Sequence, residues 1–268
     1  MSWISVAMAA VCGALAAVAA WGLLRNRTQE RWLFGAAWGL MAAALFVTAH
    51  QFITPGLQAR YDASTLDDSL SRNAAFAALK KHDPTTYARI MSELREGLLR
   101  HRSKTDLMDG VRAEVTALVQ KRLPRASDDA ATEYMRVMVQ EMGELRRHGG
   151  EVCHRFLFPK PGQTLDLTKY VSANTIEADY AALSQIVRTS TVNPQPVPQK
   201  EEVAAALRPV FEALAARYGP DLALLQNPQA PGVDPDKLCS ISIDMYSVIL
   251  QRPPSESGKL VRYLLGQS

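Results

Sequence analysis

Two long apolar runs at the start of the chain constrain its fold more than any other feature of the sequence. Residues 3–24 and 32–53 contain no Asp, Glu, Lys or Arg. A helix of this length rises about 33 Å, which is enough to cross a hydrocarbon core of about 30 Å. We therefore expect residues 1–54 to form a transmembrane helical hairpin in a lipid bilayer, with its connector at 25–31.

Tryptophans near the ends of the two runs favour a membrane location. Trp3, Trp21 and Trp32 lie where amphipathic rings settle at the membrane interface. A secretory signal peptide is a weaker interpretation, because no Lys or Arg precedes the first run and a second run comes soon after it. A buried hairpin inside a soluble protein is the other alternative.

Basic residues around the runs predict their orientation. The connector contains Arg25, Arg27 and Arg31, whereas the stretch of about twenty residues after the second run contains only Arg60 and Arg72. The positive-inside rule then places the connector in the cytoplasm. Both termini and the soluble domain would face the periplasm of a bacterial inner membrane. A cytoplasmic soluble domain is the alternative, since the margin is three arginines against two.

Small residues on the two runs predict close helix packing. Gly13, Gly35 and Gly39 belong to stripes of Gly and Ala at four-residue spacing, which let helix backbones approach closely in lipid. Packing of the two helices within one hairpin is favoured, because the partner helix is already tethered. Homodimerisation through the hairpin is the alternative.

The rest of the chain has the composition of a globular domain. Without the two runs, about 40% of its residues are apolar, and apolar positions recur at helical spacing with no sustained strand alternation. We expect an all-α, bundle-like domain of six to eight helices. Residues 55–191 form the soluble helical domain, 192–199 a proline-rich linker, and 200–268 a C-terminal helical segment packed on the same domain.

Capping residues and prolines predict where these helices begin and end. Helices should begin after Asp83, Ser103, Ser127, Asn174 and Asp234. We also expect one helix over 66–81, a helix end at Arg146–Arg147 before two glycines, an irregular connection over 156–170, and a short helical turn over 257–265.

The pairing of the cysteines indicates the compartment in which the soluble domain lies. Cys153 and Cys239 are the only two outside the apolar runs. In an oxidising periplasm they would form one disulfide, which closes a loop of about 87 residues and contributes about 4 to 5 kcal/mol of stability. Two buried free thiols in a cytoplasmic domain are the alternative. Cys12 lies inside the first run and is interpreted as a packing residue.

The sequence contains no recognisable catalytic or cofactor motif. His148, Cys153 and His154 lie close together, but their spacing matches no standard zinc pattern. We expect no metal and no cofactor, and we assign no catalytic residue.

Acidic and basic residues are distributed as in an ordinary globular protein. Asp128, Asp129 and Glu133 are interpreted as residues of a helix N-terminus rather than as paired catalytic carboxylates. The net charge of +3 falls to +1 once the connector is left out. This balance, without a basic stripe, argues against nucleic-acid binding.

These features favour a binding protein over an enzyme. We expect a membrane-anchored protein whose periplasmic domain binds a protein or peptide of the cell envelope, as a scaffold, an accessory subunit or a tethered inhibitor of the immunity type. The alternative is an envelope hydrolase acting on peptidoglycan or a similar substrate. That activity would need a buried carboxyl group with a raised pKa in a cleft.

Overall fold

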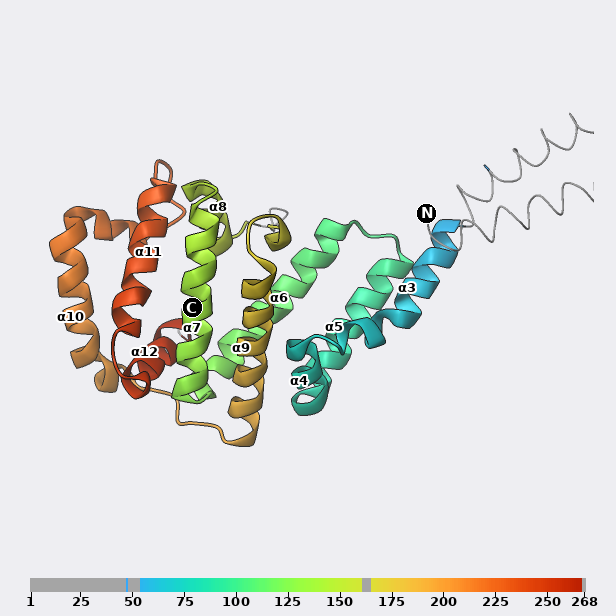
Figure 1. Ribbon diagram of the computed structural model, residues 1–268, viewed down its shortest axis with the longest axis horizontal. Helices are drawn as coiled ribbons and strands as arrows, with labels where there is room; N and C mark the ends of the chain where they lie inside the picture. Colours follow the sequence, from blue (N-terminus) through green and yellow to red (C-terminus); the bar gives the residue numbers. More distant parts are fainter. Residues whose placement is uncertain (1–46, 48–53, 161–164, 267–268) are drawn as a thin grey trace, which may run out of the picture. The chain divides into compact units, whose positions relative to one another are not determined.

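The computed structural model describes residue 47 and residues 54–160 and 165–266, and this part of the chain is all-α. The described helices are shown in Figure 1. They are α3 (Thr54–Leu70), α4 (Ala74–His82), α5 (Pro84–Leu99), α6 (Lys104–Arg122), α7 (Asp128–Arg146), α8 (Gly150–Leu157), α9 (Ala173–Val192), α10 (Lys200–Tyr218), α11 (Pro235–Leu250) and α12 (Pro254–Gly266). Short 3₁₀ turns cover Leu123–Arg125, Leu167–Lys169 and Gly219–Leu225.

The all-α prediction is confirmed, but the predicted number of helices is too low. The described residues contain ten α-helices instead of six to eight. The single helix expected over 66–81 is two helices, because Asn73 caps a new helix and accepts hydrogen bonds from Ala75 N and Phe76 N. The short turn expected over 257–265 is a helix of 13 residues with Pro254 at its first position, where the missing N–H costs no hydrogen bond.

The two predicted membrane helices, 3–24 and 32–53, lie outside the described residues apart from Val47. Among the helices of the described residues, none is long and apolar enough to cross a membrane.

Contacts divide the chain into two compact units. Apart from Val47, the described part of the first unit runs from Thr54 to Leu66 and includes Arg95–Arg102, so it contains most of α3 and the end of α5. Within this unit Ala59 and Ala63 are buried. The second unit comprises Asp67–Leu94 and Ser103–Ser268 and contains both cysteines of the predicted disulfide.

Helix α7 provides one wall of the core of the second unit. It contacts α8, α9, α11 and α12, and Figure 1 shows it between α9 and α11. The largest core cluster includes fully buried side chains from α7, α9, α10, α11 and α12: Met135, Ile186, Val210, Ile249 and Leu260.

Most of the predicted helix starts are confirmed. The side chains of Ser103, Ser127 and Asp234 accept backbone N–H groups at the starts of α6, α7 and α11. Asp83 does the same at the start of α5, where Thr86 N donates to its Oδ1 over 3.3 Å. The cap predicted at Asn174 is wrong.

Ser172 is the residue that caps α9. Its Oγ accepts from Thr175 N over 3.3 Å, so the helix begins two residues earlier than predicted and Asn174 lies inside it. Ser and Asn are similarly good N-cap residues, so residue type alone does not locate the first turn of this helix.

The proline-rich segment 193–199 contains no helix, as its prolines predict. It belongs to the second unit, and hydrogen bonds to its own main-chain atoms hold it there. Gln195 N donates to Arg125 O over 2.8 Å, and the Arg262 guanidinium donates to Pro196 O. Beyond this segment α11 and α12 pack against α7.

Candidate functional site

The two cysteines predicted to pair lie at bonding distance. Cys153 on α8 and Cys239 on α11 have their sulphur atoms 2.01 Å apart and their Cα atoms 6.0 Å apart. Both residues are fully buried in a small core cluster with Met142 and Leu145 of α7. The disulfide therefore joins two helices that already pack against each other and against α7.

The other residues singled out in the N-terminal part of the sequence lie outside the described residues. They are Trp3, Trp21 and Trp32, Arg25, Arg27 and Arg31, and Gly13, Gly35 and Gly39. Their roles stay predictions.

The histidines beside Cys153 make separate contacts. His154 Nε2 lies 2.9 Å from Pro228 O, and the ring of His148 stands edge-on to that of Tyr170. Cys153 itself is in the disulfide. Within the described part of the chain, no group of three His, Cys, Asp or Glu side chains is placed to hold a metal ion.

Acidic residues at the start of α7 take part in structural contacts. Asp128 Oδ1 accepts from the Arg262 guanidinium over 2.8 Å, and Arg262 Nε donates to Pro124 O over 3.2 Å. Arg262 is only 4% exposed, so its contacts with Asp128 and Pro196 join α12 to α7 and to the proline-rich segment. Glu133 pairs with Arg136 on the same helix.

Glu141 on α7 is a buried carboxyl group that the sequence analysis missed. It is 2% exposed, and its Oε1 has no hydrogen-bond partner among the described residues. Burial, with the negative charges of Asp179 and Glu144 nearby, raises the pKa of Glu141 to about 8. Burial also raises the pKa of half-buried Asp179, on α9, to about 6. We call Glu141, Asp179 and Arg112 the acidic junction.

Arg112 is the cation of the acidic junction. Its guanidinium, from α6, donates to Phe156 O over 2.6 Å and lies over the Phe156 ring. Its positive charge opposes the rise in the pKa of Glu141, but burial dominates. Of the two carboxyl groups of the junction, Glu141 keeps its proton at neutral pH, whereas Asp179 loses it about two pH units earlier.

Glu144 lies one turn further along α7, and its pKa is lowered rather than raised. Its carboxylate accepts from Ser172 N over 2.6 Å and from Thr175 Oγ1 over 2.7 Å at the start of α9. These hydrogen bonds lower the pKa of Glu144 because they favour the charged form. The contact fixes the start of α9 against α7.

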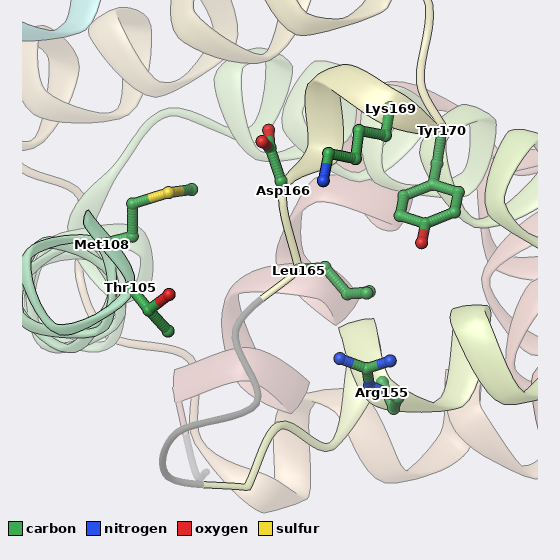
Figure 2. A pocket seen from close by; sticks show the side chains of 7 residues that line it. All are labelled: Thr105, Met108, Arg155, Leu165, Asp166, Lys169 and Tyr170. Atoms are coloured by element: carbon green, nitrogen blue, oxygen red, sulfur yellow. The ribbon is translucent and has the colours of Figure 1, made fainter. Parts of the chain in front are cut away.

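A pocket of about 340 Å³ opens along α6 and α8. Among the described residues, seven side chains line it, and Figure 2 shows them: Thr105, Met108, Arg155, Leu165, Asp166, Lys169 and Tyr170. They come from α6, from α8 and from the connection that precedes α9. Glu141 and Asp179 do not line the pocket.

Charge and apolar surface are combined in this pocket. Figure 2 shows Leu165 near its middle, Arg155 and Lys169 on opposite sides, and Thr105 with Met108 on a third side. Leu165 is buried, whereas Arg155 is half-buried and Lys169 is exposed. The Asp166 carboxylate lies on the same side of Leu165 as Lys169, and Arg155 lies on the other side. The described lining therefore combines two cationic side chains, one carboxylate and apolar surface.

Sequence reasoning missed the pocket because its lining comes from separate segments. The connection over 156–170 was predicted to be irregular, and it provides Leu165, Asp166, Lys169 and Tyr170. A signal was present in this clustering of charged and aromatic residues in a loop, since functional side chains are often placed on loops.

Comparisons with known proteins give no relative for this chain: no family model matches it, and neither a curated protein nor a solved structure matches it.

Proposed function

We propose that the chain is an inner-membrane protein whose two-helix anchor presents a periplasmic all-α domain to a protein or peptide partner of the cell envelope. The N-terminal runs support the anchor by their length and lack of charge. The role would be that of a scaffold, an accessory subunit or a tethered inhibitor of the immunity type.

The observation that carries this proposal is the buried Cys153–Cys239 pair at bonding distance. Disulfides persist in oxidising compartments and are rare in the cytosol. A structural disulfide in the soluble domain therefore supports the orientation that the arginines of the connector predict.

An envelope hydrolase is the second candidate, and Glu141 is the observation that favours it. Its pKa of about 8 is that of a carboxyl group able to donate a proton at neutral pH. Its side chain is buried, however, and it does not line the pocket. A general acid must reach the substrate within hydrogen-bond distance, so binding is favoured over hydrolysis.

Counting free thiols in cells tests the compartment. Cells making the full chain are quenched in acid, denatured and labelled with a maleimide that adds mass for each free thiol. The proposal predicts one label, on Cys12, without reductant, and three labels after reduction, since the chain has three cysteines. Three labels without reductant would contradict the periplasmic assignment.

Capture of a partner tests the binding role. The full chain, cross-linked in intact cells and purified in detergent, should retain an envelope protein that a control chain of residues 1–54 does not retain. Equal capture by the control would assign the binding to the anchor and contradict the proposed role of the domain.

A further inference from the structure

We propose that α10 pairs with α10 of a second copy of this chain, antiparallel and about a two-fold axis. The surface is one side of the helix, and its partner is the same side of an identical helix. This self-association goes beyond the proposed function, because it needs neither the membrane anchor nor the envelope partner.

Helix α10 lies at an edge of the second unit. It contacts α11, α12 and the 3₁₀ turn that follows it, and Figure 1 shows α11 between α10 and α7. Val203, Val210 and Leu214 bury one side of the helix in the largest core cluster. Phe211 lies outside that side and is 42% exposed. Aromatic side chains are enriched at protein–protein interfaces relative to the rest of the surface.

Phe211 belongs to a row of four exposed residues along α10. The others are Ala204, Arg208 and Ala215, and the spacings along the row are four, three and four residues. Residues at these spacings share one side of a helix, and they form the kind of seam along which two helices pack. The two alanines carry only methyl groups, so a second helix can approach closely at both ends of the row.

The row has the same spacing in both directions, as pairing with an identical helix about a two-fold axis requires. In an antiparallel pair with this axis between positions 209 and 210, Ala204 lies opposite Ala215 of the second copy. Arg208 then lies opposite Phe211 of the second copy, where a guanidinium over an aromatic face is attractive. Small residues therefore face each other, and each cation faces a ring.

Charge complementarity favours a second copy as the partner and fixes the direction of the pair. Arg208 Nε lies 3.6 Å from Glu212 Oε1 of the same helix, and the two side chains are 82% and 68% exposed. An ion pair so exposed contributes little to stability, so both groups can exchange partners at little cost. In the antiparallel pair Arg208 of each copy reaches Glu212 of the other, whereas a parallel pair would place Arg208 against Arg208.

The two ends of α10 repeat this complementarity. Exposed Glu201 lies in the first turn, and Arg217, which pairs with Asp244, lies in the last turn and is still 67% exposed. An antiparallel pair places the acidic first turn of each helix beside the basic last turn of the other. The helix is about 28 Å long, so one helix pair buries less than a standard interface of about 1,600 Å². We therefore expect a dimer that dissociates at micromolar concentration.

Cysteine cross-linking of the full chain in detergent tests this pairing. The background is Cys12→Ser, because Cys153 and Cys239 are already bonded to each other. Ala204→Cys together with Ala215→Cys should form a covalent dimer on mild oxidation, half complete at micromolar concentration. Either substitution alone should form none. Equal positions of the two helices lie about 16 Å apart along the axis, and a disulfide needs Cα atoms within about 7 Å.

A neighbouring side of the same helix provides the control. Ala205→Cys with Ala216→Cys has the same spacing at two exposed positions and should stay monomeric. In the cross-linking pair, Arg208→Glu should raise the concentration for half-maximal dimer about tenfold, because it would face Glu212 of the second copy. Adding Glu212→Arg should restore the original concentration, since both charges are then reversed.

Other results would overturn the pairing. Equal cross-linking by the control pair or by either single substitution would indicate random collision or a parallel arrangement. No dimer up to about 100 µM, or a dimer unaffected by Arg208→Glu, would show that this surface does not associate with itself. Cross-linking of position 204 to a different protein in intact cells, in place of a second copy, would assign the surface to that protein.

Discussion

At the scale of single residues, Glu141 makes the stability of the domain depend on pH. Its folded-state pKa of about 8 lies above the ordinary value of 4.5, so the folded domain keeps a proton that the unfolded chain releases. The contribution of this group to stability is therefore fully present below pH 4.5 and is lost as the pH rises toward 8.

We predict that Glu141→Gln removes most of this dependence. The neutral amide has nearly the shape of the protonated acid, so the variant should gain on the order of 2 kcal/mol relative to the wild type at pH 8 compared with pH 5. Hydrogen exchange of α7 in the full chain measures the difference. Glu133→Gln, at an exposed position of the same helix, is the control and should keep the wild-type profile. An unchanged profile for Glu141→Gln would show that this carboxyl is not the responsible group.

Two glycines provide a matched test of packing around α7. A Cβ on Gly258 would lie 2.6 Å from the carbonyl carbon of Asp128, which is backbone and has no room to yield. Gly258→Ala should therefore cost about 1 to 3 kcal/mol by forcing α12 away from α7. Gly143 lies within α7, and a Cβ added there would meet no atom within 4 Å, so Gly143→Ala should gain about 0.5 to 1 kcal/mol. Thermal unfolding of the full chain measures both, and equal effects would contradict the close contact.

Caps and buried charges differ in how well the sequence predicts them. Ser103, Ser127 and Asp234 were found because a cap depends on the few residues after it in the chain. Glu141 was not found, although it comes seven residues after Tyr134 and so shares its face of α7. Its burial depends on helices that are far from it in the sequence, and no local sequence pattern predicts which helices will cover it.

At the scale of elements, Arg262 fixes the C-terminal helix. It is nearly fully buried and joins α12 to the start of α7 and to the proline-rich segment. We predict that Arg262→Met costs about 3 kcal/mol, because the half-buried carboxylate of Asp128 and two carbonyl oxygens lose their partner. Limited proteolysis should then cut the segment 193–199 faster. Arg208→Met, at an exposed position of α10, should leave the cleavage rate unchanged, and equal rates for both variants would contradict the role of Arg262.

Helix boundaries were predicted less well where one helix comes directly after another. The helix end predicted at Arg146–Arg147, before two glycines, is confirmed, but the second glycine, Gly150, also begins α8. Gly149 has a φ of 119°, a conformation that favours glycine and turns the chain between the two helices. A sequence signal for the C-terminal end of a helix indicates where that helix stops. It contains no information on the element that follows.

At the scale of the whole molecule, the disulfide stabilises the domain against unfolding. It joins positions separated by 86 residues across the proline-rich segment. We predict that Cys153→Ala with Cys239→Ala lowers the free energy of unfolding by about 4 kcal/mol, from the loop-closure entropy that the bridge removes in the unfolded chain. Denaturant unfolding of the full chain measures this loss. Equal stability of the variant and the oxidised wild type would contradict a structural role.

The central claim is that this helical domain faces the periplasm, and a reporter fused after Ser268 tests it most directly. An enzyme that is active only after export, such as a phosphatase that needs disulfides, should be active in the fusion, whereas a reporter active only in the cytoplasm should be silent. Mutating Arg25, Arg27 and Arg31 to Gln should reduce the exported signal, because these residues are predicted to hold the connector inside. Activity of the cytoplasmic reporter alone would contradict the account.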